Sequence, residues 1–125
     1  MIFGLGTDVI QISRIQQSLE RYGEHVATRI LSNPELSAFR ILSPGRQTEF
    51  VAGRFAAKEA IAKAVGCGLA RLKMSSVDIS VGDRGLSVTW LNEMPVGVQK
   101  DDQILVSISH SEDTAFAVAI WSRES

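Results

Sequence analysis

The sequence has few of the features that mark secreted, membrane-bound or nucleic-acid-binding proteins. It contains a single cysteine, Cys67, so no internal disulfide can form, as is typical of proteins from a reducing cytosol. It has no apolar run near the roughly 20 residues of a membrane span, and no signal peptide is recognisable at its N-terminus. The net charge of −1 provides no overall basic field for DNA or RNA. We therefore expect a cytoplasmic protein without membrane or nucleic-acid partners, whose anion binding depends on local clusters of Arg and Lys.

Length and composition are those of one globular domain. The chain has 125 residues, 45% of them apolar, and we expect a single domain over residues 1–125. The pattern changes from helical to strand-like along the chain, which favours an α+β fold over a wound parallel sheet. Helices are predicted at 13–22, 24–31, 32–42 and 49–65, and strands at 1–12, 77–81, 86–91, 104–110 and 114–121, with an irregular loop at 92–102.

Three helix boundaries carry explicit sequence signals. Ser13 with Gln16, and Ser32 with Glu35, have the spacing of a capping box, in which two side chains satisfy free backbone N–H groups. Gly66 follows the last helical residue of the longest helix, where glycine is the usual terminator. These signals predict where the first, third and fourth helices begin or end.

The longest helix, predicted over residues 49–65, organises the chain. Ala, Lys and Glu, which dominate it, are strong helix formers. At about 100° per residue, one face carries an apolar stripe that we expect to face the core. This stripe consists of Phe50, Ala57, Ile61 and Ala64.

Charged side chains on the same helix form two pairs with a spacing of four residues. Glu59 and Lys63 share one side, and Arg54 and Lys58 share another. Apolar residues lie between the pairs, so some of this charge adjoins apolar surface. One carboxylate close to several cations suits a site for a metal and a phosphate, whereas the alternative is ordinary salt bridging on a helix surface.

Asp8 lies inside the apolar first strand, which Gly4 and Gly6 interrupt. Glycines in a strand often mark the close approach of another backbone or a ligand. A buried carboxylate is costly unless a cation or a metal pairs with it. Asp8 is therefore a candidate metal ligand, and the alternative is that it caps a turn at the end of the strand.

Three arginines in the predicted N-terminal helices, and His110 near the C-terminus, can each be either structural or functional. Arg14, Arg21 and Arg29 either belong to a solvated helix surface or form a basic face for an acidic helical partner. His110, at the predicted end of a strand, is either a hydrogen-bonded structural residue or a group that donates to phosphate or acts as a base.

Several segments together resemble the holo-acyl-carrier-protein synthases, which belong to the 4'-phosphopantetheinyl transferase superfamily. Their order, their spacing and the chain length all match, so that the resemblance covers nearly the whole chain. The matching segments are Leu5–Ile10 with Arg14 and Ile15, Arg29–Ser32 with Glu35, Arg54–Ala60 with Lys63–Gly68, and Val106–Ser111.

The resemblance implies a fold, an activity and a set of partners. The fold would be an antiparallel sheet packed on a long central helix, with short helices near the N-terminus. The activity would be transfer of the 4'-phosphopantetheine arm of coenzyme A to a serine of an apo-acyl carrier protein, in fatty acid or polyketide biosynthesis, with adenosine 3',5'-bisphosphate as by-product. The family depends on Mg²⁺, and its small members are homotrimers with a coenzyme A site at each subunit interface.

The resemblance also implies roles for individual residues. Asp8 and Glu59 would hold Mg²⁺, Lys63 would bind phosphate or stabilise the leaving group, and Glu59 or a water on the metal would deprotonate the carrier serine. His110 would reach coenzyme A from a neighbouring subunit. Coenzyme A would be bound by Arg54, Lys58, Lys63, Gly66, Gly68, Gly85, His110 and Ser111, and the acyl carrier protein by Arg14, Arg21 and Arg29.

One departure from the family pattern supports a competing hypothesis. The family often has Gly-Lys-Pro in the middle hairpin, where this chain has Gly85-Leu86-Ser87, so a cation expected near the nucleotide is missing. The chain could instead be a non-catalytic module that binds a carrier protein. A Mg²⁺-dependent phosphohydrolase is a third reading, which only the two carboxylates favour.

Overall fold

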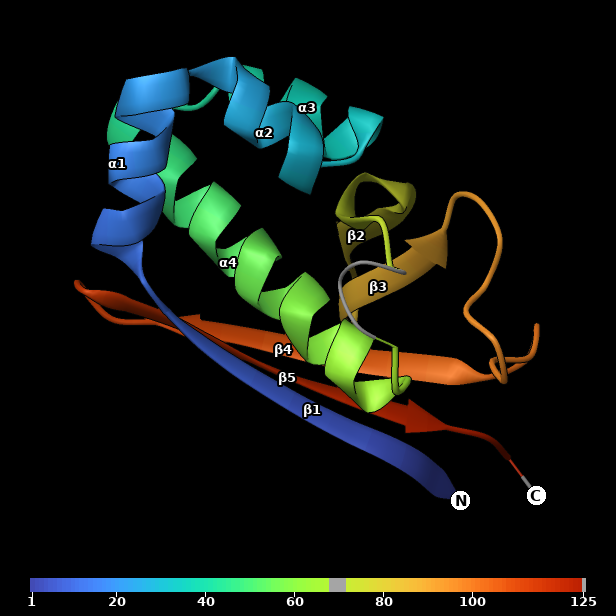
Figure 1. Cartoon of the computed structure of the whole chain (residues 1–125). Helices are drawn as coiled ribbons and strands as arrows, with labels where there is room; N and C mark the ends of the chain where they lie inside the picture. The colour runs from blue at the N-terminus through green and yellow to red at the C-terminus, as the bar shows by residue number, and fades with distance from the viewer. Residues whose placement is uncertain (68–71, 125) are drawn as a thin grey trace.

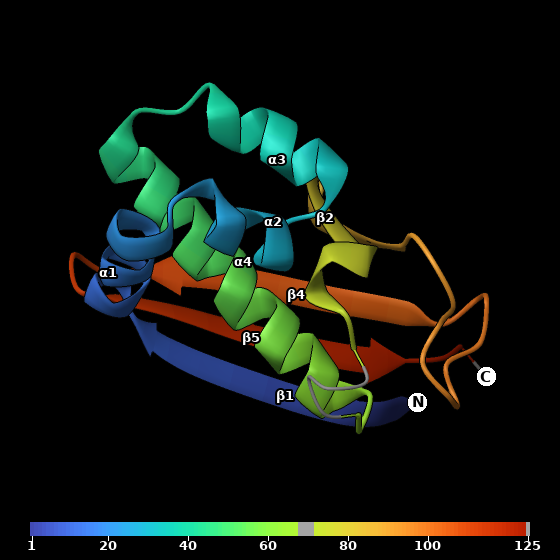
Figure 2. The same cartoon turned by 45° about the horizontal axis from the view of Figure 1, so that its top comes forward.

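One long helix lies across a three-stranded antiparallel sheet, with shorter helices on its other side. The computed structural model describes residues 1–67 and 72–124. Helix α4 (Pro44–Ala64) runs over the sheet, and α1 (Ile12–Tyr22), α2 (Glu24–Ile30) and α3 (Asn33–Arg40) cover it from above (Figures 1 and 2). The predicted α+β class is confirmed, with α4 as the middle layer. In the described part of the chain, no helix is both long and apolar enough to cross a membrane.

The sheet contains three long strands, and a separate hairpin packs beside it. Strand β1 (Ile2–Gln11) pairs with β5 (Thr114–Ser122), which pairs with β4 (Gln103–His110), so β1 and β4 form opposite edges. The hairpin consists of β2 (Val77–Gly82) and β3 (Gly85–Trp90), and follows a short 3-10 turn, η1 (Met74–Ser76). All pairings are antiparallel, and the predicted strands and hairpin agree with them to within two residues at each end.

The helix boundaries confirm two of the three sequence signals. The Ser32 hydroxyl accepts from the Glu35 amide at 3.2 Å, and a Glu35 carboxylate oxygen accepts from the Ser32 amide at 2.9 Å, so this capping box is present. Gly66 adopts a φ of +75° just beyond the end of α4, as expected. The box at Ser13 was wrong: α1 begins one residue earlier, at Ile12, so Ser13 lies inside the helix instead of at its N-cap, and no side chain caps this helix.

Helix α4 is longer and more buried than the sequence pattern indicated. It begins at Pro44 rather than near residue 49, since proline suits the first turn of a helix. The predicted stripe was too narrow, because the sheet covers one side of α4 and the other helices cover the opposite side (Figure 1). Most buried positions on α4 are therefore small, and they include Ala52, Ala56, Ala57, Ala60, Ala62 and Ala64.

The sheet approaches α4 so closely because β1 carries glycine at the contact. A Cβ atom added at Gly6 would lie 1.9 Å from the Ala60 carbonyl oxygen, and one added at Gly4 would lie 1.7 Å from that of Ala64. Neither position has room for a side chain, because backbone atoms occupy the space. The glycines of the first strand therefore mark the approach of another backbone, as the sequence suggested.

We expect Gly6→Ala to destabilise the protein by more than about 3 kcal/mol, because the added methyl group would force β1 and α4 apart. Gly45→Ala is the matched control: the same atom added at Gly45 meets open space within α4, where alanine is the better helix former. Urea denaturation measures both changes. Equal stability of Gly6→Ala and the wild-type protein would contradict this packing.

Candidate active site

Asp8, Glu59 and Lys63 come together where β1 faces the last turns of α4. Asp8 lies on the same side of β1 as Gly4 and Gly6, the side that faces α4, because strand side chains alternate. The Lys63 ammonium lies 3.5 Å from Oδ1 of Asp8 and donates to the Thr7 carbonyl at 3.0 Å. The Asp8 side chain is only 16% exposed, whereas that of Lys63 is 57% exposed. Asp8 is thus a nearly buried carboxylate within a strand, and the interpretation of it as a strand-end cap is not supported.

The two carboxylates of this cluster repel each other. Burial raises the pKa of Glu59 above its ordinary value, and the charge of Asp8 raises it further, whereas Lys63 opposes both. A divalent cation between the two carboxylates would relieve this repulsion. Mg²⁺ takes one or two protein carboxylates together with phosphate and water oxygens, so this pair fits it. The described residues contain no cluster of three or more His, Cys, Asp or Glu that could hold a metal, so phosphate and water would complete the coordination.

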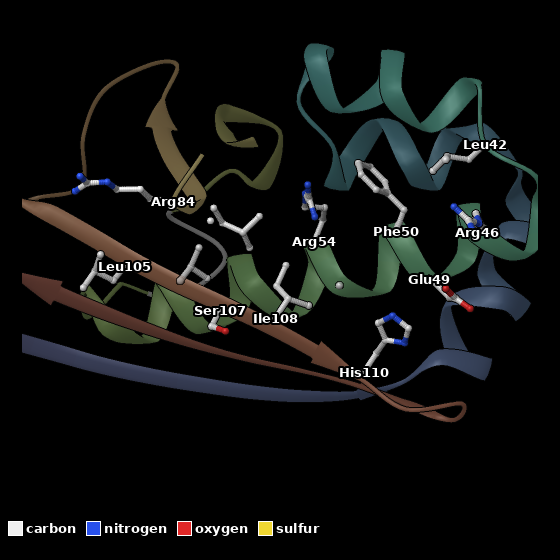
Figure 3. A pocket seen from close by; sticks show the side chains of 14 residues that line it. Leu42, Arg46, Glu49, Phe50, Arg54, Arg84, Leu105, Ser107, Ile108 and His110 are labelled. Carbon is white, nitrogen blue, oxygen red and sulfur yellow. The ribbon is translucent and has the colours of Figure 1, made fainter. Parts of the chain in front are cut away.

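A second feature, a cleft of about 830 Å³, lies on the other side of α4, between this helix, β4 and the β2–β3 hairpin (Figure 3). Three arginines and one histidine line it: Arg46 and Arg54 from α4, Arg84 from the hairpin turn, and His110 from the end of β4. This concentration of positive charge suits an anion with several phosphates. The other lining residues are Leu42, Glu49, Phe50, Gly53, Gly85, Leu86, Leu105, Val106, Ser107 and Ile108.

Arg54 is the most enclosed cation of this cleft. Its guanidinium carbon lies 4.5 Å from the centre of the Phe50 ring, and its Nε lies 3.7 Å from Oε2 of Glu35. Burial lowers the pKa of Arg54, and the charges of Glu35 and Asp78 oppose this. Among the described residues, its buried Nε has no hydrogen-bond partner. This Nε faces Glu35, so an anionic ligand in the cleft would pair with the terminal guanidinium nitrogens, for which no hydrogen bond is present in the described part of the chain.

The prediction that Lys58 binds coenzyme A does not agree with its position. Its side chain is completely buried and faces away from the cleft, into the layer between α4 and the N-terminal helices. Its ammonium donates to Oε1 of Glu35 at 2.5 Å and to the carbonyls of Ile30 at 2.7 Å and Met74 at 3.0 Å. Three acceptors satisfy the three donors of the ammonium. Lys58 is a structural residue, which the sequence could not separate from Arg54 because both lie on one side of the helix.

The remaining residues predicted to bind coenzyme A lie in three places. Gly85 and His110 line the cleft, whereas Gly66 lines a separate hollow at the C-terminal end of α4. Ser111 lies in the turn after β4, where its hydroxyl accepts from the amides of Asp113 and Thr114. Gly68 lies outside the described residues. The structure thus brings Arg54, Gly85 and His110 together in one chain.

The sequence analysis missed two cations of the cleft. Arg84 precedes Gly85 in the hairpin turn, and Arg46 lies in the first turn of α4, before the start predicted for this helix. Because Arg84 lies two positions before Leu86, it can supply a positive charge where the family's lysine is missing. The signal for Arg84 was its place in a predicted hairpin turn, but only the tertiary structure shows that this turn faces α4.

The predicted carrier-binding arginines lie on the outer surface of the N-terminal helices. Arg14 and Arg21 are seven residues apart on α1, and Arg29 lies near the end of α2. All three are exposed, and no ion pair is present for any of them within the described part of the chain. They are thus available to an acidic partner.

Within one chain, the carboxylate cluster and the cationic cleft are separated by α4. The cluster lies at β1 and the cleft at β4, which are opposite edges of the same sheet (Figure 1). Neither Asp8, Glu59 nor Lys63 lines the cleft. A ligand that contacts both regions of one chain would have to pass around α4.

Comparisons with known proteins find similarity over nearly the whole chain. The family model of the 4'-phosphopantetheinyl transferase superfamily matches residues 4–121. A holo-[acyl-carrier-protein] synthase from Geobacillus sp. (strain WCH70) is 42% identical, with coverage of 98% of each chain. One from Oceanobacillus iheyensis is 41% identical, with coverage of 99% of this chain and 100% of that protein.

Solved structures give the same result. The holo-(acyl-carrier-protein) synthase of Bacillus anthracis, in complex with CoA (3',5'-ADP), has a TM-score of 0.80 at 36% identity, with coverage of 97% of this chain and 96% of that one. The Neisseria meningitidis synthase has a TM-score of 0.85 at 32% identity, with coverage of 98% and 100%. The chain therefore belongs to the 4'-phosphopantetheinyl transferase superfamily, within the holo-acyl-carrier-protein synthase family.

The raised pKa of Glu59 makes a prediction for the metal-free protein. A carboxyl group with a raised folded-state pKa stabilises the fold fully below its unfolded pKa, near 4.5, and this contribution is lost as the pH rises through the folded value. Glu59→Gln should therefore raise the melting temperature at pH 7 to 8 in EDTA, and the gain should disappear near pH 4.5. Thermal denaturation across this range measures it. A lower melting temperature than wild type at pH 8 would contradict the repulsion.

Proposed function

We propose that this chain transfers the 4'-phosphopantetheine arm of coenzyme A to a serine hydroxyl of an apo-acyl carrier protein. The serine oxygen attacks the phosphorus attached to the pantetheine, a new P–O bond forms, and the pyrophosphate bond breaks to release adenosine 3',5'-bisphosphate. The observation that carries this proposal is the match to holo-acyl-carrier-protein synthases at about 40% identity over nearly the full length. A cationic cleft large enough for a nucleotide supports it.

The residues of this chain divide the work between the two regions. Arg46, Arg54, Arg84 and His110 would bind the nucleotide phosphates in the cleft, because arginine pairs with phosphate through two donors. Asp8 and Glu59 would hold Mg²⁺, which supplies neutralisation of the pyrophosphate charge when bound. The Lys63 ammonium, already close to Asp8, would donate to the departing phosphate.

Glu59 is the candidate base for the carrier serine. Burial and the charge of Asp8 raise the pKa of Glu59, and a higher pKa makes its carboxylate a better proton acceptor than that of an exposed glutamate. The proton of the serine hydroxyl would pass to this carboxylate as the P–O bond forms. Glu59 is assigned this role because it lies in the carboxylate cluster beside Asp8.

We further propose that the protein works as a homotrimer. The outer face of the sheet, turned away from α4, carries exposed apolar side chains. The strand register makes them neighbours: Val9 is opposite Phe116, and Leu5 and Leu105 lie on either side of Ile120. Association through this face would remove an apolar patch from water. It would also allow the cleft of one subunit to approach the carboxylate cluster of the next, so that one coenzyme A contacts both.

An acyl carrier protein is the proposed partner of the N-terminal helices. Arg14, Arg21 and Arg29 are exposed, and a carrier with an acidic helix would pair with them. The cytoplasm is the proposed location, because the single cysteine is typical of a reducing compartment.

The activity is tested by mass spectrometry of an apo-acyl carrier protein incubated with this protein, coenzyme A and Mg²⁺. We expect the carrier to gain about 340 Da, the mass of the transferred arm. Asp8→Ala and Glu59→Ala should abolish the gain, as should EDTA. Gly45→Ala serves as the active control, because Gly45 does not line the cleft and an added Cβ there meets open space.

The alternatives predict different results in the same assay. A non-catalytic carrier-binding module would bind the carrier in a salt-sensitive way without any change in mass. A phosphohydrolase would release phosphate from coenzyme A without a protein acceptor. Either result would overturn the proposed transfer.

Subunit complementation tests the shared site. Asp8→Ala and Arg54→Met should each be inactive alone, but trimers that contain both should regain about a third of wild-type activity, since one of their three interfaces combines an intact Asp8 with an intact Arg54. Co-expression with two affinity tags isolates the mixed trimers. Mixed trimers without activity would show that one chain supplies both regions.

A further inference from the structure

Glu35 is a buried carboxylate that accepts three hydrogen bonds, of which the helix cap accounts for only one. Its side chain is 2% exposed. Oε1 accepts from the Ser32 amide at 2.9 Å and from the Lys58 ammonium at 2.5 Å, and Oε2 accepts from the Ile79 amide at 2.8 Å. These partners come from α4, the start of α3 and β2, so the carboxylate is fixed from three directions.

Arg54 approaches the same carboxylate but makes no hydrogen bond with it. The distance of 3.7 Å between Nε of Arg54 and Oε2 of Glu35 is too long for one. The closer donors of Lys58 and Ile79 occupy the carboxylate oxygens, so Glu35 attracts Arg54 by charge alone. The ring of Phe50 covers one face of the guanidinium at 4.5 Å (Figure 3).

This arrangement holds Arg54 in place without consuming its hydrogen-bonding capacity. A free arginine loses side-chain entropy when a ligand immobilises it. Here, the packing against Phe50 and the charge of Glu35 already restrict the Arg54 side chain in the folded protein, so less entropy is lost when a ligand binds. The guanidinium lies at the wall of the cleft with its buried Nε unpaired, within the part of the chain that the structure describes.

We propose that Glu35 is a positioning residue that orients Arg54 for a phosphate group of the nucleotide in the cleft. This inference rests on the proposed function, because it takes the cleft as the nucleotide site. The sequence shows Glu35 only as the capping partner of Ser32. In the structure the same carboxylate joins the helix cap to the cationic cleft, so a change in it reaches Arg54 without touching the ligand.

The test measures binding of adenosine 3',5'-bisphosphate to the full chain by titration calorimetry. Glu35→Gln keeps the size and the acceptor oxygen but removes the charge, and we expect about tenfold weaker binding. With coenzyme A as substrate, the same variant should raise KM about tenfold and leave kcat within about twofold. In an Arg54→Met background, Glu35→Gln should cause no further loss, because its effect passes through Arg54.

Asp102→Asn is the matched control, because it removes another buried carboxylate charge paired with an arginine. The Asp102 side chain is 0% exposed and lies 2.6 Å from Nε of Arg123, away from the cleft. It should lower the melting temperature but leave nucleotide binding unchanged. If Glu35→Gln also loses only thermal stability, Glu35 is purely structural and the inference fails.

Three further outcomes have defined consequences. If Glu35→Gln does not fold, since Lys58 loses its counter-ion, Glu35→Gln with Lys58→Met removes both charges and is tested in its place. If Arg54→Met binds the nucleotide as tightly as wild type, the inference is wrong even when the carrier assay succeeds. A failure of the carrier assay with normal nucleotide binding would refute the proposed transfer and leave the role of Glu35 intact.

Discussion

The close contact between β1 and α4 is the constraint on which the rest of the structure depends. The glycines of β1 let its backbone touch the carbonyl groups of Ala60 and Ala64. Because the sheet lies so near, the buried positions of α4 carry mainly alanine. The same contact brings Asp8 to the end of α4 where Glu59 and Lys63 lie. The position of this candidate metal ligand in the middle of a strand thus follows from a packing requirement.

Neighbouring charges on α4 have different environments because the helix turns about 100° at each residue. Lys58 points into the layer beneath the N-terminal helices, where Glu35 and two carbonyls satisfy it. Glu59, the next residue, points toward β1 and experiences the repulsion of Asp8. Arg54, one turn before Lys58, reaches the cationic cleft. One buried helix therefore supplies a structural ion pair, a candidate metal ligand and a candidate phosphate ligand.

The separation of these groups around α4 explains why one chain presents two incomplete regions. A helix in the middle layer exposes its two flanks to opposite edges of the sheet, so charges on those flanks cannot meet within the chain. The apolar outer face of the sheet provides a surface for association. The proposed trimer accounts for both the separated regions and the exposed apolar face. The apolar outer face belongs to the same sheet whose edges carry the carboxylate cluster and the cleft.

The sequence by itself determined the order of elements, the hairpin, the Ser32 cap and the stop at Gly66, because these depend on residues close together in the chain. It also pointed to Asp8 and Glu59 through the cost of a charge among apolar neighbours and through family resemblance. Only the tertiary structure decided that Lys58 is buried, that Arg46 and Arg84 join Arg54, and that Glu35 links a helix cap to the cleft. Spacing along a helix tells which side chains share a flank, but what each flank faces depends on packing between segments distant in sequence.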